Sequence, residues 1–333
     1  MTPGTDHSDQ AAPTLSVVMP AFNAAAFIDE AIDSVLSQTY ADLELIIVDD
    51  ASTDDTLDII ERRALDDDRI RILRNETNLG PGGSTNRGIE VAAGHLIGRM
   101  DADDISLPER FEIQVATLRE NPHYAVVGTF ASHINEEGVI LSLSKTGPVS
   151  EVEFDRLRGA DEPTMVFGGT ALFTRELFDK VGGFDPQLRA AVELDLFDRM
   201  SDHGPIIAVP EPLLHYRLHA NSIVATRFYE GRQIHRFVWA RRASQNSGKQ
   251  PMTLDQFIAW ENQRPVWRMV FVRLDDSAQL HYREAGLAFG GNDRMGLLWN
   301  LTRAFLANPR WVLHRLWTQR FSPEARASSH LSS

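Results

Sequence analysis

Three acidic side chains lie close together in the stretch RMDADD, residues 99–104, directly after the apolar run HLIG. Like charges at this spacing repel each other unless a cation lies between them. If the stretch leaves a strand in extended form, Asp101 and Asp103 point the same way and Asp104 points the other way. Two carboxylates on one side suit a hard divalent cation such as Mg²⁺ or Mn²⁺. The alternative is that Asp103 or Asp104 caps the next helix while the other acids are solvated.

These acids follow the fourth of several strands that alternate with helices. The runs LSVVMP, LELIIVDD, RIRIL and HLIGRM predict buried strands, and amphipathic runs between them predict helices. Ser52 or Thr53 is the expected N-cap of the second helix, and Gly94 is the expected end of the third. The alternation predicts parallel strands with right-handed crossovers, in a Rossmann-like α/β sheet. Ligands gather at the carboxyl ends of such strands, where polar residues of this chain fall: Asn23, Asp49, Asp50, Asn78 and Asp101 to Asp104.

The pattern predicts three parts of the chain. Residues 1–14 lack the charged and apolar regions of a secretory signal, and we expect them to form a disordered lead-in. We expect residues 15–222 to form the α/β domain. We expect residues 223–333 to form a mainly helical extension. The sequence contains no run of about 18 apolar residues, which is the length that a membrane span would need.

Composition limits the classes of function. The 333 residues include no cysteine, which excludes disulfides and thiolate metal sites. The net charge of -14 argues against a nucleic-acid-binding protein, which would present a basic face. The expected location is the cytoplasm, with room for contact at the inner face of the cell membrane.

The order of the motifs is more specific than any one of them. VVMPAFNA, ELIIVDDASTDDT, NLGPGGSTNRGI, GRMDADDISLPERF and GGF ahead of VELDLFDRM closely resemble the family 2 glycosyltransferases, which have the GT-A fold. The resemblance is nearly continuous from about Leu15 to Ser222. It implies an inverting transfer of a sugar from a nucleotide donor, usually a uridine diphosphate (UDP) sugar, to a hydroxyl acceptor. Cell-surface polysaccharide or glycolipid synthesis is the expected setting, with a saccharide or lipid-linked acceptor and Mn²⁺ or Mg²⁺ as cofactor.

The resemblance implies a donor site residue by residue. PAFN lies along the nucleoside, Asp50 reads the base edge, and small residues let the backbone approach the base. Asp101 lies nearer the ribose and Asp103 on the metal that bridges the two phosphates, so that the metal supplies the missing positive charge. The implied donor-binding residues are Pro20, Ala21, Phe22, Asn23, Asp50, Asn78, Gly80, Gly82, Asp101, Ala102, Asp103 and Arg217.

The segment HYRLHANS resembles the family's YR-x-H segment. By that comparison His219 completes the metal shell with Asp103 and Asp101, and Arg217 faces the diphosphate. Imidazole is a common metal ligand, and guanidinium recognises phosphate oxygens well. Outside the family comparison, a single His in a strand-like segment more often packs in a core than binds a metal.

The helix AVELDLFDRM resembles the family's AEDYDLWLRL-like helix, whose Glu-Asp pair contains the general base. Val192 falls on the usual Glu and Glu193 on the usual Asp, which is a departure from the pattern. Glu193 retains a carboxylate that can take a proton from an acceptor hydroxyl, and Asp195 is the fallback. Gly168, Gly169 and Thr170 fall where the family lines the acceptor side, although small residues there also suit strand packing.

The last segment is basic and aromatic. Residues 295–321 set Trp and Phe among arginines, which suits an anionic membrane surface. The alternative is that these helices pack on the core domain or on a second subunit of a homo-oligomer.

Three other functions remain as alternatives to the glycosyltransferase. A non-catalytic carbohydrate-binding or scaffold protein would keep the fold and lose the base, as the Val192 departure allows. A nucleotidyltransferase would need a G-x-G-T-R-like loop after the first strand, which the sequence lacks. A phospho-acceptor receiver domain explains the VDD motif but not the second acidic cluster.

Overall fold

The computed structural model describes residues 14–219, 226–290 and 293–317. The predicted lead-in up to residue 13, residues 220–222 and the end of the 295–321 segment lie outside the described residues. The chain divides into two compact units, Met1–Arg217 with Ile234–Lys249 and Leu218–Gln233 with Gln250–Ser333. Residues 234–249 thus belong with the first unit, although the sequence assigned everything after residue 222 to an extension.

The described residues of the first unit form a sheet of nine strands. The strand order is β3-β2-β1-β4-β8-β6-β9-β5, and β7 pairs with β6. The strands are β1 (Leu15–Ala21), β2 (Leu43–Asp49), β3 (Ile70–Arg74), β4 (Leu96–Arg99), β5 (Ile105–Ser106), β6 (Val126–Ile134), β7 (Ile140–Ser144), β8 (Leu172–Thr174) and β9 (Ile206–Arg217). Between them lie α1 (Ile28–Leu36), α2 (Thr56–Asp66), α3 (Gly80–Val91), α4 (Arg110–Glu120), α5 (Glu151–Gly159), the 3₁₀ turn η1 (Gly168–Thr170), α6 (Arg175–Val181) and α7 (Val192–Met200).

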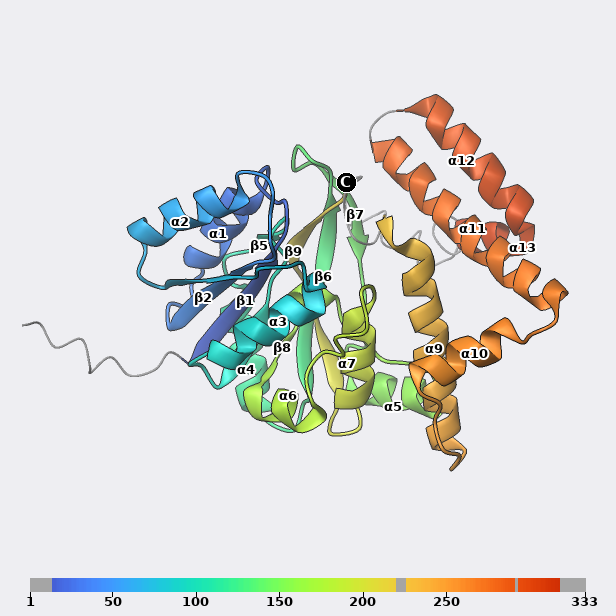
Figure 1. Cartoon of the computed structure of the whole chain (residues 1–333), viewed down its shortest axis with the longest axis horizontal. Helices are drawn as coiled ribbons and strands as arrows, with labels where there is room; N and C mark the ends of the chain where they lie inside the picture. Colours follow the sequence, from blue (N-terminus) through green and yellow to red (C-terminus); the bar gives the residue numbers. More distant parts are fainter. Residues whose placement is uncertain (1–13, 220–225, 291–292, 318–333) are drawn as a thin grey trace, which may run out of the picture. The chain divides into compact units, whose positions relative to one another are not determined.

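The first four strands are parallel, as the sequence predicts. The chain moves from β1 through β2 to β3 in one direction and then returns across β1 to β4. Because such crossovers are right-handed, the change of direction puts α1 and α2 on one face of the sheet and α3 on the other (Figure 1). The carboxyl ends of β1 and β4 therefore border the crevice where open α/β sheets bind ligands.

The close fit of α3 on the sheet depends on one glycine. Every residue of β2 is buried, as expected of a parallel strand covered on both faces. A Cβ atom at Gly88 would overlap the Val18 side chain and lie 3.2 Å from Val48 Cγ2. The absence of a side chain at Gly88 thus lets α3, whose first residues lie at the crevice, pack against β1 and β2.

Two expectations about helix ends are wrong. The N-cap of α2 is Asp55, and Ser52 and Thr53 instead bond to the loop after β1. The helix α3 ends at Val91, so Gly94 does not stop it. A Cβ atom at Gly94 would lie 2.7 Å from the backbone nitrogen of Ser16, which means that a close backbone approach explains this glycine.

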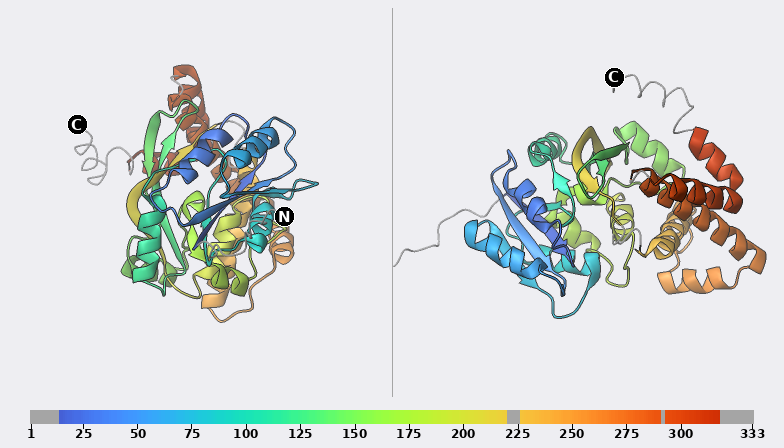
Figure 2. Two further views of the ribbon diagram at one scale, coloured as in Figure 1. Left: turned by 90° about the vertical axis from the view of Figure 1, so that its left-hand side faces the viewer. Right: turned by 90° about the horizontal axis from the view of Figure 1, so that it is seen from above.

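The described residues after β9 are mainly helical, in line with the prediction. They form α9 (Phe228–Asn246), α10 (Leu254–Asn262), α11 (Val266–Gly290), α12 (Arg294–Ala307) and α13 (Pro309–Leu316). A capping box at Thr253 and Gln256 begins α10. Within the second unit α12 lies along α11 (Figures 1 and 2). Among the described helices, none combines the length and the apolar character that crossing a bilayer requires.

We predict that Gly88→Ala lowers the free energy of unfolding by about 1 to 3 kcal/mol, because the added methyl overpacks the contact between α3 and the sheet. The matched control is Gly159→Ala at the end of α5, where an added Cβ meets nothing within 4 Å. That control should leave stability unchanged or raise it by up to about 1 kcal/mol. Urea denaturation of the three proteins provides the measurement, and equal stability of the two variants would contradict the proposed packing role.

Candidate active site

The loops after β1 and β2 are joined by hydrogen bonds. The Asn23 N–H donates to Ser52 Oγ at 3.1 Å, and the Thr53 N–H donates to Asn23 Oδ1 at 2.8 Å. Asn23 and Ala51 both have left-handed backbone, with φ of 50° and 62°. Such conformations cost free energy in residues other than glycine and cluster at functional sites. Beside them, the Phe22 side chain is 51% exposed and open to a ligand.

Asp50 connects this edge of the sheet to α3. Its carboxylate accepts the N–H groups of Leu79 at 2.7 Å and Gly80 at 2.8 Å, and the Asn75 side-chain amide at 2.7 Å. Gly80 has φ of +77°, which favours glycine. The amide of Asn78 donates to the Asp50 carbonyl at 3.3 Å. The sequence-predicted donor residues after β2 and β3 thus lie together, and the reading of a base by Asp50 stays a prediction.

A buried guanidinium joins the acidic cluster to α7. Nη2 of Arg99 lies 2.9 Å from Asp101 Oδ1 and 2.9 Å from Glu193 Oε1. The Arg99 side chain is 3% exposed, whereas those of Asp101 and Glu193 are 28% and 20% exposed. The predicted base and the predicted donor-binding acid therefore face the same space, and both remain reachable from solvent.

Two further arginines support the loop that carries the acids. Arg110 is fully buried and donates to the carbonyl of Arg99 at 2.7 Å. Arg217 is 2% exposed and donates to the Asp103 carbonyl at 2.9 Å, to the Glu136 carbonyl at 2.8 Å and to Glu30 at 2.6 Å. Its backbone N–H donates to Asp104 Oδ1 at 2.9 Å.

The sequence assigned Arg217 to the diphosphate. In the structure its guanidinium holds the acidic loop against the neighbouring loop and α1, and its role toward a donor stays a prediction. His219 belongs to the second unit, which begins at Leu218, and its role as a metal ligand also stays a prediction.

The charges of this cluster do not balance within the protein. Burial, together with the charges of Asp103 and Glu193, raises the pKa of Asp101 to about 6, and Arg99 opposes this shift. Burial and the two neighbouring aspartates raise the pKa of Asp104 well above its usual range. Asp104 Oδ2 is buried and has no hydrogen-bond partner. The cluster therefore has more carboxylate oxygens than the protein satisfies. Such oxygens are the ligands that a hard divalent cation prefers.

Among the described residues, no three His, Asp or Glu side chains converge closely enough to hold an ion by themselves. That finding is compatible with Mg²⁺-type sites, which commonly use one or two carboxylates together with phosphates of the substrate. The residues present therefore fit such a metal, with Asp101 and Asp103 as its first candidates.

Two glycines of η1 lie against the acids on different sides. A Cβ atom at Gly168 would lie 2.8 Å from Glu193 Cγ, and one at Gly169 would lie 3.1 Å from Asp101 Oδ2 and 3.3 Å from Asp104 Oδ2. Thr170 is fully buried, and its Oγ1 accepts the Thr129 N–H at 3.0 Å. The predicted acceptor-side segment thus lies at the acids, with its glycines in contact and its threonine turned into the core.

The structure separates the two candidate bases. Both carboxylate oxygens of Asp195 are held by arginines, Oδ1 by Arg241 at 2.6 Å and Oδ2 by Arg199 at 2.7 Å, and the residue is 2% exposed. Val192 is buried and packs near Gly82, which explains why an apolar residue is tolerated at that position. Glu193 is therefore the carboxylate of α7 that faces the acidic cluster.

The sequence analysis missed the arginines that position these carboxylates. Arg99 lies inside the RMDADD stretch and Arg110 lies in LPERF, close in sequence to the three acids. Three neighbouring acids need cations nearby, and this need was the signal that could have pointed to these arginines. No local signal relates Arg241 and Arg242 of α9 to α7. Arg242 lies 2.8 Å from Asp198, and the two residues are 2% and 1% exposed.

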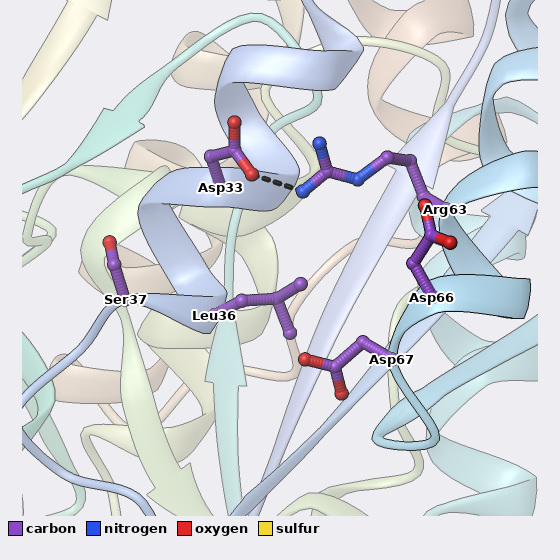
Figure 3. Close-up of a pocket in the computed structure, with 6 residues that line it drawn as sticks. All are labelled: Asp33, Leu36, Ser37, Arg63, Asp66 and Asp67. Carbon is purple, nitrogen blue, oxygen red and sulfur yellow. Dashed lines mark hydrogen bonds and ion pairs between the residues drawn. The ribbon is translucent and has the colours of Figure 1, made fainter.

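A hollow of about 380 Å³ lies between α1 and α2, away from this site (Figure 3). It is lined by Asp33, Leu36, Ser37, Arg63, Asp66 and Asp67. Arg63 points at Asp33 and is already paired with it and with Asp29. Both helices end there, on the side of the amino ends of β2 and β3, whereas the acidic cluster follows the carboxyl end of β4.

Comparison with known proteins identifies the family. The sequence model described as glycosyl transferase family 2 matches residues 16–182, half of the chain. An uncharacterised glycosyltransferase of Haemophilus influenzae is 34% identical over 221 residues, which are 63% of this chain and 67% of that protein. The chain belongs to glycosyl transferase family 2. It is also 31% identical over 193 residues to the chondroitin synthase of Escherichia coli, and this match covers 58% of the chain but only 27% of the synthase.

Solved structures of glycosyltransferases share the fold. S. aureus TarS 1-349 in complex with UDP-GlcNAc has a TM-score of 0.56 and 18% identity over 87% of this chain and 90% of that one. The mannosyltransferase PcManGT from Pyrobaculum calidifontis, in complex with GDP-Man and Mn2+, has a TM-score of 0.53 and 19% identity over 96% of this chain and 79% of that one. At this identity the likeness shows the fold, and it confirms the predicted GT-A architecture of this family 2 glycosyltransferase.

We predict that the two neighbouring glycines of η1 give different defects when each is changed to alanine. Gly168→Ala displaces Glu193, so transfer should fall at least tenfold while donor affinity is retained. Gly169→Ala presses on Asp101 and Asp104, so donor affinity itself should fall. Each variant is the control for the other. Donor titration by calorimetry and steady-state rates provide the measurements, and identical defects would contradict the separate positions predicted for the base and the donor.

Proposed function

We propose that this chain transfers a sugar with inversion from a nucleotide donor, with UDP as the first candidate, to a hydroxyl of a saccharide or lipid-linked acceptor. The setting is the synthesis of a cell-surface polysaccharide or glycolipid. Family membership supports glycosyl transfer, and the similarity to chondroitin synthase supports polymer synthesis. The UDP-GlcNAc complex of TarS supports a uridine donor, and the GDP-Man complex of PcManGT marks guanosine as the alternative.

One observation carries the proposal of a catalytic protein. Arg99 contacts Asp101 and Glu193 at 2.9 Å each, so a carboxylate suited to the donor and one suited to the acceptor meet at a single fixed cation. A scaffold protein that had lost its base would have no reason to keep Glu193 in this contact. The first turn of α7 also favours a carboxylate there through the helix dipole.

The proposed reaction is a single displacement. Glu193 takes the proton of the acceptor hydroxyl as its oxygen attacks the anomeric carbon. The bond between that carbon and the phosphate oxygen breaks, and its electron pair leaves with the nucleoside diphosphate. Attack opposite to the leaving group inverts the anomeric carbon.

Arg99 holds Glu193 in place throughout the reaction, and the Asp50 loop holds the donor. A divalent cation held by Asp101 and Asp103 would neutralise charge on the leaving diphosphate.

We predict that UDP with Mn²⁺ raises the melting temperature of the full chain, because a ligand that binds only the folded state stabilises it by mass action. The gain is about 2.7 kcal/mol at a free ligand concentration 100 times Kd. Asp103→Ala should abolish the metal-dependent part, whereas Asp155→Ala, an exposed acid on α5, should not. Differential scanning fluorimetry with UDP, GDP and a chelator provides the measurement. The absence of a shift with every nucleoside diphosphate would rule out the donor site.

We predict that Glu193→Gln lowers kcat by on the order of 10² to 10⁴, because the amide cannot accept the proton. The response of the melting temperature to UDP should stay as in the parent protein. Glu176→Gln, an exposed glutamate in the first turn of α6, is the matched control and should keep full activity. Full transfer by Glu193→Gln would remove Glu193 from the role of base.

A further inference from the structure

The helix α12 leaves an apolar stripe exposed. Met295, Leu298, Trp299 and Leu306 are 84%, 69%, 64% and 75% exposed. At about 100° per residue these four side chains fall within an arc of roughly 100° on one side of the helix. The exposed residues Arg294 and Arg303 fall on opposite flanks of that arc. An apolar stripe with a cationic side chain on each flank is the pattern of a helix lying in a lipid interface.

The first half of α11 repeats this arrangement. Exposed apolar residues recur there at helical spacing: Val266, Trp267, Val270, Phe271 and Leu274. The exposed Arg268 and Arg273 lie on the two sides of this stripe. On α13, Leu313 and Trp317 are 57% and 59% exposed one turn apart. Three neighbouring helices of the second unit therefore carry uncovered apolar surface, which in water is a cost that a binding partner removes.

Arginines and tryptophans are paired on these helices. On α11 the guanidinium of Arg268 lies 5.1 Å from the Trp267 ring centroid, and just before α11 that of Arg264 lies 3.9 Å from the ring of Trp260 on α10. The guanidinium of Arg303 lies 5.9 Å from the Trp299 ring. Tryptophan prefers the interface between water and lipid, and an arginine beside it can reach lipid phosphates.

The charge of this segment is opposite to that of the chain. Residues 294–317 contain four arginines and no acid, whereas the whole chain has a net charge of -14. All four, Arg294, Arg303, Arg310 and Arg315, are exposed. A partner for this surface must therefore be both apolar and anionic.

We propose that α11, α12 and α13 form a docking surface for an anionic lipid bilayer, with the tryptophans in the headgroup region and the arginines at the phosphates. A second copy of the chain fits less well. A symmetric contact through the α12 and α13 stripes would bring the arginines of two copies face to face, and these two helices carry no acid that would neutralise them. The inference concerns the second unit alone and does not rest on the proposed glycosyl transfer.

Co-sedimentation of the full chain with large unilamellar vesicles tests this proposal. We expect binding on the order of a hundredfold tighter to vesicles of phosphatidylcholine with phosphatidylglycerol than to phosphatidylcholine alone, because each arginine near the surface adds attraction. Salt at about 0.5 M should remove most of this difference, because it screens the charges. Absence of binding to either vesicle would overturn the proposal.

Two double variants distinguish the apolar and the cationic contributions. Leu298→Ser with Trp299→Ser should lower binding to both vesicles at least tenfold. Arg294→Gln with Arg303→Gln should lower binding only to the anionic vesicles. Leu65→Ser with Val152→Ser is the matched control, since these first-unit residues are 88% and 81% exposed, and it should bind like the parent.

Circular dichroism confirms that each variant is folded, and light scattering gives its mass. The proposal would be overturned if the Leu65 and Val152 control lost as much vesicle binding as the Leu298 and Trp299 variant. A dimer of the parent protein that the Leu298 and Trp299 variant dissociates would assign the surface to a second copy instead.

Discussion

The buried guanidinium of Arg99 is the constraint around which the site is arranged. Carboxylates from the end of β4 and from the first turn of α7 would repel each other without a cation between them. A single cation, 3% exposed, contacts one carboxylate from each element at 2.9 Å and so sets the distance between them. The glycines of η1 leave room for this contact, because a Cβ atom at either one would press on the acids.

Ion pairs between arginines and carboxylates also hold α7 in place. Asp195 and Asp198 form ion pairs with Arg241 and Arg242 of α9, and both aspartates and Arg242 are buried. Burying ion pairs carries a large desolvation cost, and removing one partner would leave an unpaired buried charge. The pairs therefore fix the orientation of α7, and with it the direction in which Glu193 points.

Much of the fold follows from local pattern. The apolar runs of β1 and β2 and the alternation with amphipathic segments were enough to predict parallel strands and the edge where polar residues gather, because both faces of such a sheet are covered. The motif order was enough to place the chain in its family. Helix ends were less predictable. Serine, threonine and glycine are typical capping residues, but Ser52, Thr53 and Gly94 instead contact parts of the chain that are distant in sequence.

The sequence by itself determined which elements form, in which order, and which residue types stand at the strand ends. It left open whether Glu193 or Asp195 faces the acidic cluster, because both acids lie in the first turn of α7 and local spacing treats them alike. Only the tertiary structure decided this, by surrounding Asp195 with arginines from α7 and α9 and leaving Glu193 at the crevice. The physical reason is that the protonation and reach of a carboxylate depend on burial and on charges brought from distant parts of the chain, which no local pattern encodes.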